Sequence, residues 1–271
     1  MPGLAAVVIL SLGVGIGVNT AVFSWIQTIV LKPIPGIDNS ASFYHVEPKS
    51  DTGTYPGMSW AEYRDLTPQL PSIEELVAFR MAPLNVGQAG RTERTYAQLV
   101  SGNFFTALKL QPVAGRFIRA DEVVRPGAEP VVVLSHDYWQ RNFGGAQSVI
   151  GQTIRVNDLP LTIVGVAPED FQGTILALQF DLWVPATLAP ALFAGSGELD
   201  SRSQRGYSVM GRLRHNATQA QATAEFTAAM GGLAIAFPET NGRISGELIP
   251  YWRAPRGPQM MFLTTLAVLQ G

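Results

Sequence analysis

The chain has 271 residues, no cysteine and a formal net charge of −2 at pH 7. The absence of cysteine excludes disulfides, thiolate metal sites and cysteine nucleophiles. The nearly balanced charge gives no sign of a nucleic-acid surface or of a polybasic patch that binds lipid. We therefore expect no nucleic-acid partner.

The N-terminus is an uninterrupted apolar stretch. No charged residue precedes Lys32, and the chain from Leu4 to Leu31 carries only mild polar groups. As a helix, these residues would extend about 42 Å, which exceeds the ~30 Å hydrocarbon core of a bilayer. We predict a transmembrane helix within residues 1–31. A cleaved signal peptide is the alternative, but the apolar run is too long for one and no basic region precedes it.

The C-terminus becomes apolar again. Every charged residue lies between Lys32 and Arg256, and residues 257–271 carry no charge. We predict that residues 257–271 begin a second transmembrane helix that is cut off, so that the chain is a fragment of a longer membrane protein. Residues 32–256 are long enough to form a sizeable core.

Small residues recur in the predicted first span. Gly13, Gly17 and Ala21 follow one another at every fourth position and so share one helix face. This spacing lets two membrane helices approach closely. Glycine is also common in such helices, and the sequence leaves both interpretations open.

The first half of the central segment alternates between short strands and short helices. Pro33 and Pro35 end the apolar helix, because proline cannot continue one. Ser59 is predicted to begin a helix, with Glu62 three residues later as in a capping box. We also predict strands over residues 42–48, 73–80 and 94–100, and a short helix over residues 103–108.

The next segment contains a predicted buried strand, a capped helix and a hairpin. The strand covers residues 130–134 and Ser135 caps the helix that follows, which ends at Gly144. The hairpin pairs residues 153–156 with 161–166 through a four-residue connection. A further strand is predicted over residues 181–184.

The last third predicts a strand, a long helix and a second strand. The strands cover residues 207–213 and 243–250, and Thr218 with Gln221 forms a capping box between them. One helix face carries Phe226, Met230, Leu233 and Phe237, and Pro238 stops the helix. This order suits a split βαβ unit, so the predicted class is α+β with a membrane anchor.

No nucleotide-binding loop is present. A P-loop requires Gly-Lys-Ser/Thr, and none of the three lysines, Lys32, Lys49 and Lys109, follows a glycine. The glycines from Gly13 to Gly17 have Val18 in place of the third glycine of a dinucleotide loop, and they lie in an apolar helix. ATP hydrolysis by a P-loop of this chain is excluded.

No catalytic or metal-binding spacing stands out. The histidines His45, His136 and His215 are far apart and lack the spacing of metal ligands. Ser59 and Ser208 have only the first glycine of the GxSxG pattern. The acidic pairs Glu74–Glu75, Asp121–Glu122 and Glu169–Asp170 are most simply solvated turns. We therefore predict no enzyme activity, no catalytic, cofactor-binding or metal-binding residues, and no cofactor.

Six segments in order resemble one family, the MacB-like periplasmic core domain of ABC-transporter permeases (MacB/FtsX type). The resemblance is nearest to the duplicated permeases of acidobacteria. It rests on these segments: LSLGVGIGVNTAVFSWIQTIVLKPIP, VSGNFFTALKLQPVAGRFIRADE, VVVLSHDYWQRNFGG, VIGQTIRVNDLPLTIVGVAPEDFQG, DLWVPATL, and ATQAQATAEFTAAM with FPETN. Each segment is weak alone, and their common order carries the assignment.

The resemblance implies a permease subunit of an exporter in the inner membrane, with its main domain in the periplasm. Its expected partners are an ABC ATPase subunit, a second permease copy or duplicated half, the lipid bilayer and a periplasmic adaptor protein. The domain would convert cytoplasmic ATP hydrolysis into motion outside the membrane, which is called mechanotransmission. It would have a porter-like βαβ lobe at about residues 42–110 and 206–252, and an inserted β-rich lobe at about 111–205.

Two other functions remain open at this point. The chain could be a membrane-tethered extracytoplasmic binding or sensor domain without transport activity, whose span is only an anchor. An anchored hydrolase with a dispersed active site is the third hypothesis, which the missing catalytic motifs disfavour. The transported substrate does not follow from the sequence, since fold does not fix function.

Overall fold

A computed structural model describes residues 3, 11–17, 19–20, 23–24, 34–88, 91–127, 129–175 and 178–255. Within these residues, none of the helices combines the length and apolar character that crossing a membrane requires. Much of the predicted first span, residues 1–31, and all of the predicted second span, residues 257–271, lie outside the described residues.

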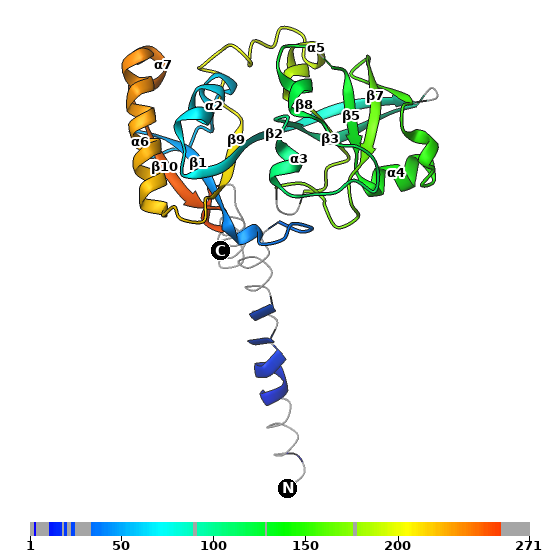
Figure 1. Ribbon diagram of the computed structural model, residues 1–271. Helices are drawn as coiled ribbons and strands as arrows, with labels where there is room; N and C mark the ends of the chain where they lie inside the picture. Colours follow the sequence, from blue (N-terminus) through cyan, green and yellow to red (C-terminus); the bar gives the residue numbers. More distant parts are fainter. Residues whose placement is uncertain are drawn as a thin grey trace.

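The described domain is built on one ten-stranded sheet with the order β10-β1-β9-β2-β3-β8-β5-β7-β4, and β6 pairs with β2 and β7 (Figure 1). The strands are β1 (Phe43–Ser50), β2 (Ile73–Gln88), β3 (Arg91–Val100), β4 (Ala114–Gly115), β5 (Val131–Leu134), β6 (Thr153–Val156), β7 (Leu159–Val166), β8 (Leu182–Pro185), β9 (Ser208–Leu213) and β10 (Ile244–Pro250). The α-helices are α2 (Trp60–Leu66), α3 (Phe104–Ala107), α4 (His136–Phe143), α5 (Ala189–Leu192), α6 (Gln219–Ala236) and α7 (Pro238–Asn241).

One end of the sheet consists of two interleaved split βαβ units. Strands β9 and β10 both run antiparallel to β1, which lies between them, and α6 connects them. In the same way, β1 and β2 flank β9, and α2 connects them. This is the βαββαβ arrangement of ferredoxin-like folds. The predicted split βαβ unit in the last third is confirmed.

Strand β2 connects this end of the sheet to the other. Its first residues pair with β9, and residues 79–88 pair with β3. The predicted strand, residues 73–80, was too short: β2 continues through Pro83 to Gln88, although proline is uncommon inside strands. The structure continues the alternation instead, with Ala82, Leu84 and Val86 buried and Pro83 paired with Tyr96.

The other end of the sheet holds the strands that lie between β2 and β9 in the sequence. Strand β3 runs parallel to β8, and β5 pairs with β8 and β7. Helix α4 begins where the sequence predicts: the Ser135 hydroxyl accepts from the Tyr138 amide at 3.0 Å, and Gly144 ends the helix with a φ of 59°. Glycine adopts this left-handed conformation without steric cost.

The connection of the β6–β7 hairpin is shorter than predicted. Asn157 and Asp158 alone form the turn, with φ values of 46° and 66°. Positive φ at both central residues gives a tight turn whose twist matches the flanking strands. Leu159 and Pro160 therefore belong to β7, where Pro160 lies opposite Arg155.

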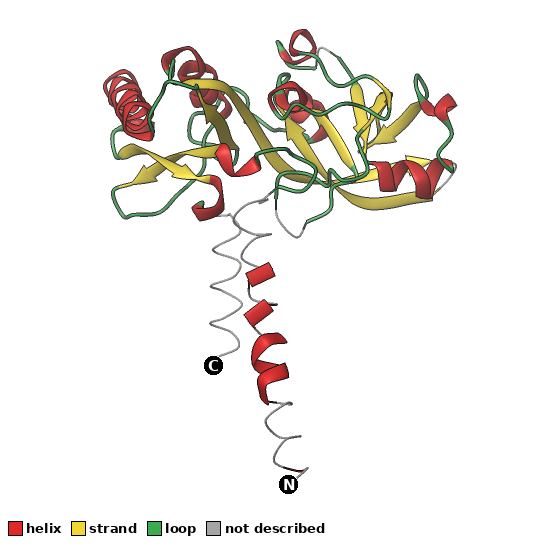
Figure 2. Cartoon of the chain, turned by 60° about the horizontal axis from the view of Figure 1, so that its bottom comes forward, coloured by secondary structure: helices red, strands yellow, loops and turns green. Residues whose placement is uncertain are grey.

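Two hydrophobic clusters cover the two faces of the sheet. One holds side chains of α2 and α6, among them Trp60, Phe226 and Met230. The other, here called the base cluster, is rich in aromatic residues: Ile34, Ile37, Phe43, Phe79, Phe104, Phe105, Phe171, Trp183 and Tyr251 are among its members. The described N-terminal residues 11–17 project away from the domain on this side (Figures 1 and 2).

Candidate functional site

The three histidines lie in three separate places. His45 is buried in β1, with its Nδ1 atom 3.2 Å from Glu47 Oε1. His136 begins α4, and His215 is exposed in the loop before α6. In the part of the chain that the structure describes, no three acidic or histidine side chains gather as metal ligands.

The two serines with a preceding glycine have structural surroundings. The Ser59 hydroxyl accepts from the Glu62 amide at 3.2 Å and donates to the Glu62 carboxylate at 2.8 Å, which confirms the predicted capping box. Ser208 begins β9 and is buried in the sheet.

The three acidic pairs lie either exposed on the surface or bound to neighbouring arginines. Glu74 and Glu75 are exposed at the start of β2, and Glu169 and Asp170 are exposed in a turn. The hydrogen bond from Arg119 lowers the pKa of Asp121. Burial opposes ionisation of Glu122, but hydrogen bonds from Arg116 and from the Arg119 amide outweigh it and lower the pKa of Glu122.

The two ends of the folded domain meet at its base. The incoming segment, residues 34–42, buries Ile34 and Ile37, and the outgoing segment, residues 251–254, buries Tyr251 and Ala254. Ile34, Ile37 and Tyr251 belong to the same base cluster. We call these two segments, with the loop 170–175 that both contact, the base joint.

The incoming segment packs tightly against the loop at Gly36. This residue has a φ of 74°, and a Cβ atom added there would lie 2.7 Å from the carbonyl oxygen of Asp170. Only glycine fits such a close approach of two backbones without a shift. Within the incoming segment, the Ser40 hydroxyl accepts a hydrogen bond from the Ile34 amide at 3.3 Å.

The outgoing segment is tied to the same loop through Tyr251. Its hydroxyl donates to the Thr174 carbonyl oxygen, and its ring centroid lies 5.1 Å from that of His45. Tyr251 is 2% exposed, and burial raises its pKa. A phenol so deeply buried requires a hydrogen-bond partner, which the loop supplies.

From Thr174, the hydrogen bonds continue into the far end of the sheet. The Gln98 amide nitrogen donates to the Thr174 hydroxyl at 2.8 Å, and Trp183 Nε1 donates to Gln98 Oε1 at 2.9 Å. Gln98 belongs to β3 and Trp183 to β8. Thr174 therefore links the end of β10 to these two strands, because its carbonyl oxygen accepts from Tyr251 and its hydroxyl accepts from Gln98. In such a network, each buried polar group depends on its neighbours.

A second polar system holds the segment that crosses back from α5 to β9, residues 193–207, here called the crossover segment. The Glu198 carboxylate accepts two hydrogen bonds from the Arg80 guanidinium, at 2.8 and 2.7 Å, and one from the Tyr207 hydroxyl at 2.5 Å. Two parallel hydrogen bonds between a guanidinium and a carboxylate fix the orientation of the two groups as well as their distance.

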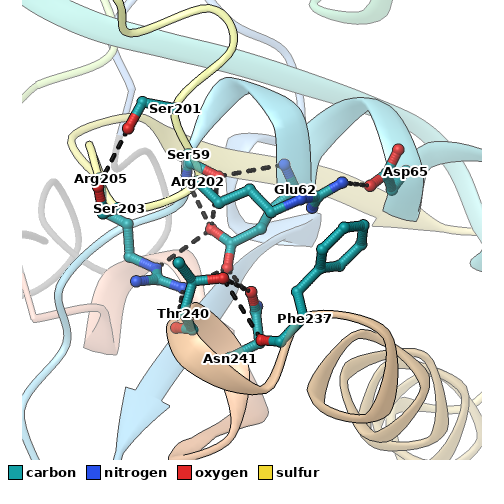
Figure 3. Close-up of polar contacts among 10 residues, drawn as sticks. All are labelled: Ser59, Glu62, Asp65, Ser201, Arg202, Ser203, Arg205, Phe237, Thr240 and Asn241. Carbon is teal, nitrogen blue, oxygen red and sulfur yellow. Dashed lines mark hydrogen bonds and ion pairs between the residues drawn. The ribbon is translucent and has the colours of Figure 1, made fainter.

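Further along the crossover segment, Arg205 reaches the buried carboxylate of Glu62 (Figure 3). The Arg205 Nη2 atom donates to Glu62 Oε1 at 2.6 Å and to the Thr240 carbonyl at 2.9 Å. Asn241 Nδ2 donates to the same Glu62 oxygen at 2.6 Å. Glu62 thus joins α2, α7 and the crossover segment at one point.

Arg202 makes the neighbouring contact. Its guanidinium pairs with Asp65 and lies 3.5 Å from the centroid of the Phe237 ring (Figure 3). The prediction that Phe237 continues the buried face of the helix was wrong. α6 ends at Ala236, and Phe237 turns outward to stack on Arg202, with 36% of its surface exposed.

Sequence reasoning found the Ser59–Glu62 capping box but missed these partners. The partners are far apart in the chain: Glu62 and Arg205 are separated by 143 residues, and Thr174 and Tyr251 by 77. Neither set forms a motif with fixed spacing, so a single sequence contains no signal for them. What the arrangement provides is mechanical: the base joint and the crossover segment tie the two ends of the sheet together.

Comparison with known proteins identifies the family of this chain. The family model described as the MacB-like periplasmic core domain matches residues 5–229. The chain belongs to this family.

Curated relatives of this MacB-like chain are much longer proteins. It is 36% identical over 106 residues to a probable syringafactin export ATP-binding/permease protein of Pseudomonas syringae pv. tomato, covering 39% of this chain and 16% of the relative. It is 25% identical over 211 residues to the macrolide export ATP-binding/permease protein MacB of Burkholderia cenocepacia, covering 72% of this chain and 29% of the relative. The matches thus span less than a third of either relative.

Solved structures show the same mixed α/β fold. A domain of a putative permease from Porphyromonas gingivalis superposes with a TM-score of 0.60 at 15% identity, covering 80% of this chain and 92% of that one. The periplasmic region of MacB from Actinobacillus actinomycetemcomitans gives 0.58 at 14% identity, covering 83% and 94%.

We predict that Gly36→Ala destabilises the domain more than Gly53→Ala. Both glycines have positive φ, 74° and 82°, but a Cβ at Gly53 meets nothing within 4 Å. Strain alone accounts for about 1 kcal/mol in each variant, and the clash with Asp170 adds to it only in Gly36→Ala. Urea denaturation measures both. Equal losses would show that the incoming segment is not held tightly at the base joint.

We predict that Arg205→Met lowers the free energy of unfolding by about 3 kcal/mol, because it leaves Glu62 buried without its cation. Arg243→Met is the matched control. The Arg243 side chain is 86% exposed and lies 3.9 Å from Asp51, so its loss should cost less than about 1 kcal/mol. The double variant Arg205→Met with Glu62→Gln should recover part of the loss. A small effect of Arg205→Met would contradict the conclusion that Arg205 compensates the buried charge of Glu62.

Proposed function

We propose that this chain is part of the permease subunit of a MacB-type ABC exporter, and that its periplasmic domain couples ATP hydrolysis in the cytoplasm to the export of substrate by mechanotransmission. Family membership and the export permeases named among the relatives support this proposal. The observation that carries it is the base joint. There, the incoming and outgoing segments pack on one loop and one aromatic cluster.

The geometry of the base joint suits the passage of motion from the membrane. In this proposal, residues 1–31 and 257–271 belong to transmembrane helices in the inner membrane. A displacement of either helix would act directly on residues 34–42 or 251–254, and the contacts of Gly36 and Tyr251 would carry it into the sheet. Packed interiors transmit such strain because they are dense and hardly compressible.

The proposed partners follow from the same assignment. They are an ABC ATPase subunit, a second permease copy or duplicated half, the lipid bilayer and a periplasmic adaptor protein. The domain itself is proposed to be non-catalytic.

We also propose that the periplasmic domain has two lobes. The porter-like lobe would comprise residues of about 42–110 and 206–252, and the inserted lobe about 111–205. The two interleaved βαβ units at one end of the sheet support this division. Strands β2 and β3 would connect the lobes, since β3 pairs with β8 as well as with β2.

A membrane-tethered binding or sensor domain is the second candidate. A groove of about 340 Å³ lined by Tyr55, Gln219, Glu247, Leu248, Ile249, Pro250, Arg253 and Pro255 favours it. Pockets for small ligands usually measure about 300–1,000 Å³ and contain a few polar groups. This groove is open and partly polar, so we rank the tethered binding or sensor domain below the permease assignment.

Reading the native gene beyond Gly271 separates the two candidates. The permease proposal predicts three further hydrophobic spans, the first continuing from residues 257–271. A stop codon or a soluble domain at that place would contradict the permease and favour the tethered domain. Ligand screening against the groove would then replace transport assays.

We predict that Gly17→Leu weakens the association of two permease copies in a membrane cross-linking assay, because leucine keeps the helices apart where small residues let them approach. Gly15→Leu is the matched control. Gly15 lies two residues away, and therefore on a different helix face from Gly13 and Gly17. Unchanged cross-linking of Gly17→Leu would remove this role from the glycine face.

A further inference from the structure

Strand β2 contains a bulge near its start. It pairs regularly with β9 from Leu76 onward, but the register shifts by one residue before that point. Glu74 and Glu75 therefore lie together opposite a single residue of β9, Arg212. Successive side chains of a regular strand point to opposite faces, whereas Ile73 and Leu76 both belong to the cluster that holds side chains of α2 and α6. The bulge thus turns both glutamates to the other face of the sheet, and bulges often re-aim side chains beside functional sites.

On that face, the two glutamates line a small pocket together with cations from two other elements. The pocket has a volume of about 30 Å³, and its lining residues are Phe43, Glu74, Glu75, Thr106, Ala107, Lys109 and Arg212. Arg212 lies on β9, and Lys109 follows α3. Pockets for drug-sized ligands measure about 300–1,000 Å³. This one admits a group about as large as a water molecule or an ammonium ion.

The Arg212 guanidinium is fixed in this pocket with one of its donors unused. Its Cζ atom lies 4.4 Å from the centroid of the Phe43 ring, and its Nη2 atom donates to the Asp38 carbonyl oxygen at 3.2 Å. Burial lowers the pKa of Arg212, although the charges of Glu74 and Asp38 oppose this shift. The Nε atom is buried and has no hydrogen-bond partner among the described residues. Because an unpaired buried donor is costly, an oxygen atom of a ligand would be stabilised there.

Both signs of charge surround the pocket, yet they do not pair with each other. None of the ion pairs within the described part of the chain joins Glu74 or Glu75 to Lys109 or Arg212. Opposite charges that line one pocket without contact can be bridged by a ligand that carries both an ammonium and an anionic group. A ligand with one sign of charge would satisfy only half of them.

The pocket adjoins the incoming segment. Phe43 follows this segment directly and belongs to the base cluster, and Arg212 binds Asp38 within the segment. Asp38 comes seven positions after Leu31, the end of the predicted first span, so the chain keeps the two within about 25 Å. The described residues 11–17 project from this side of the domain (Figures 1 and 2).

We propose that the pocket binds the phosphoethanolamine headgroup of a zwitterionic membrane lipid. The ammonium lies between the two glutamates, and the phosphate oxygens accept hydrogen bonds from Arg212 Nε and from Lys109. Guanidinium and ammonium groups are the usual partners of phosphate in proteins. The lipid as the source of this headgroup rests on the membrane placement of residues 1–31 in the proposed function.

Native mass spectrometry of the full chain in detergent micelles tests the specificity, because it counts the lipids that stay bound. Phosphatidylethanolamine should be retained about tenfold more than phosphatidylcholine, whose methylated ammonium cannot donate hydrogen bonds and is too large for the pocket. It should exceed phosphatidylglycerol, which has a phosphate and no cation, by the same factor. Equal retention of the three lipids, or a preference for phosphatidylglycerol, overturns the proposal.

Two exposed residues of the pocket allow matched variants. Glu75→Gln and Lys109→Asn should each lower the retention of phosphatidylethanolamine about fivefold, since each removes one charged partner of the headgroup. Asparagine tolerates the φ of 58° at position 109. Glu239→Gln and Arg243→Gln make similar changes at exposed positions outside the pocket and should leave retention unaltered. Thermal melting checks that all four variants are folded, and loss of retention in all of them or in none overturns the proposal.

Soluble phosphoethanolamine distinguishes a lipid from a free zwitterion. At equal concentration it should leave the bound lipid in place, because the lipid remains anchored in the micelle next to the pocket. Displacement of the lipid would assign the pocket to a soluble zwitterion and overturn the lipid as its ligand.

Alkaline washing of membranes that contain the chain separates this inference from the proposed function. A chain that stays in the washed membranes but shows no preference for phosphatidylethanolamine would retain the permease assignment and exclude the headgroup site. A chain that washes off would overturn both.

Discussion

The hydrogen bond between Tyr251 and Thr174 connects the end of β10 with the far end of the sheet. This bond satisfies a buried phenol, and it fixes the turn that follows β10 to a loop between β7 and β8. Thr174 is bound in turn to Gln98, and Gln98 to Trp183. An unpaired buried polar group costs about 1–3 kcal/mol, and loss of the Tyr251 hydroxyl removes this donor from the Thr174 carbonyl oxygen. The outgoing segment is therefore part of the core of the far end of the sheet, although it follows β10 in the chain.

The crossover segment provides the second link between the two ends. Its acidic and basic side chains are held by Arg80, Glu62 and Asp65, which belong to β2 and α2. A buried carboxylate such as Glu62 is tolerated only when cations and donors surround it, and here Arg205, Asn241 and Ser59 all contribute. The base joint and the crossover segment lie on different faces of the sheet. Together they oppose independent movement of its two ends, as the proposed transmission of a displacement from the membrane would require.

Local signals in the sequence predicted much of the fold and little of the site. The caps at Ser59, Ser135 and Thr218 each act within three residues, and the structure contains all three. Hydrophobic alternation and helical spacing then gave the order of elements and the split βαβ unit. The part of β2 beyond Arg80 was missed, although alternating burial continues there through Pro83. The contacts of Tyr251 and Arg205 depend on how distant segments come together, and no local pattern encodes that.

Hydrogen exchange on Tyr251→Phe tests the central claim most directly. The account predicts faster amide exchange in the outgoing segment, in residues 171–175 and in β8, because the loop at Thr174, whose hydroxyl binds Gln98, loses the donor to its carbonyl oxygen. Tyr44→Phe, on the strand that pairs with β10, serves as the control and should leave these regions unchanged. If exchange rises only within residues 251–254, the base joint does not connect the outgoing segment to the sheet, and the account is contradicted.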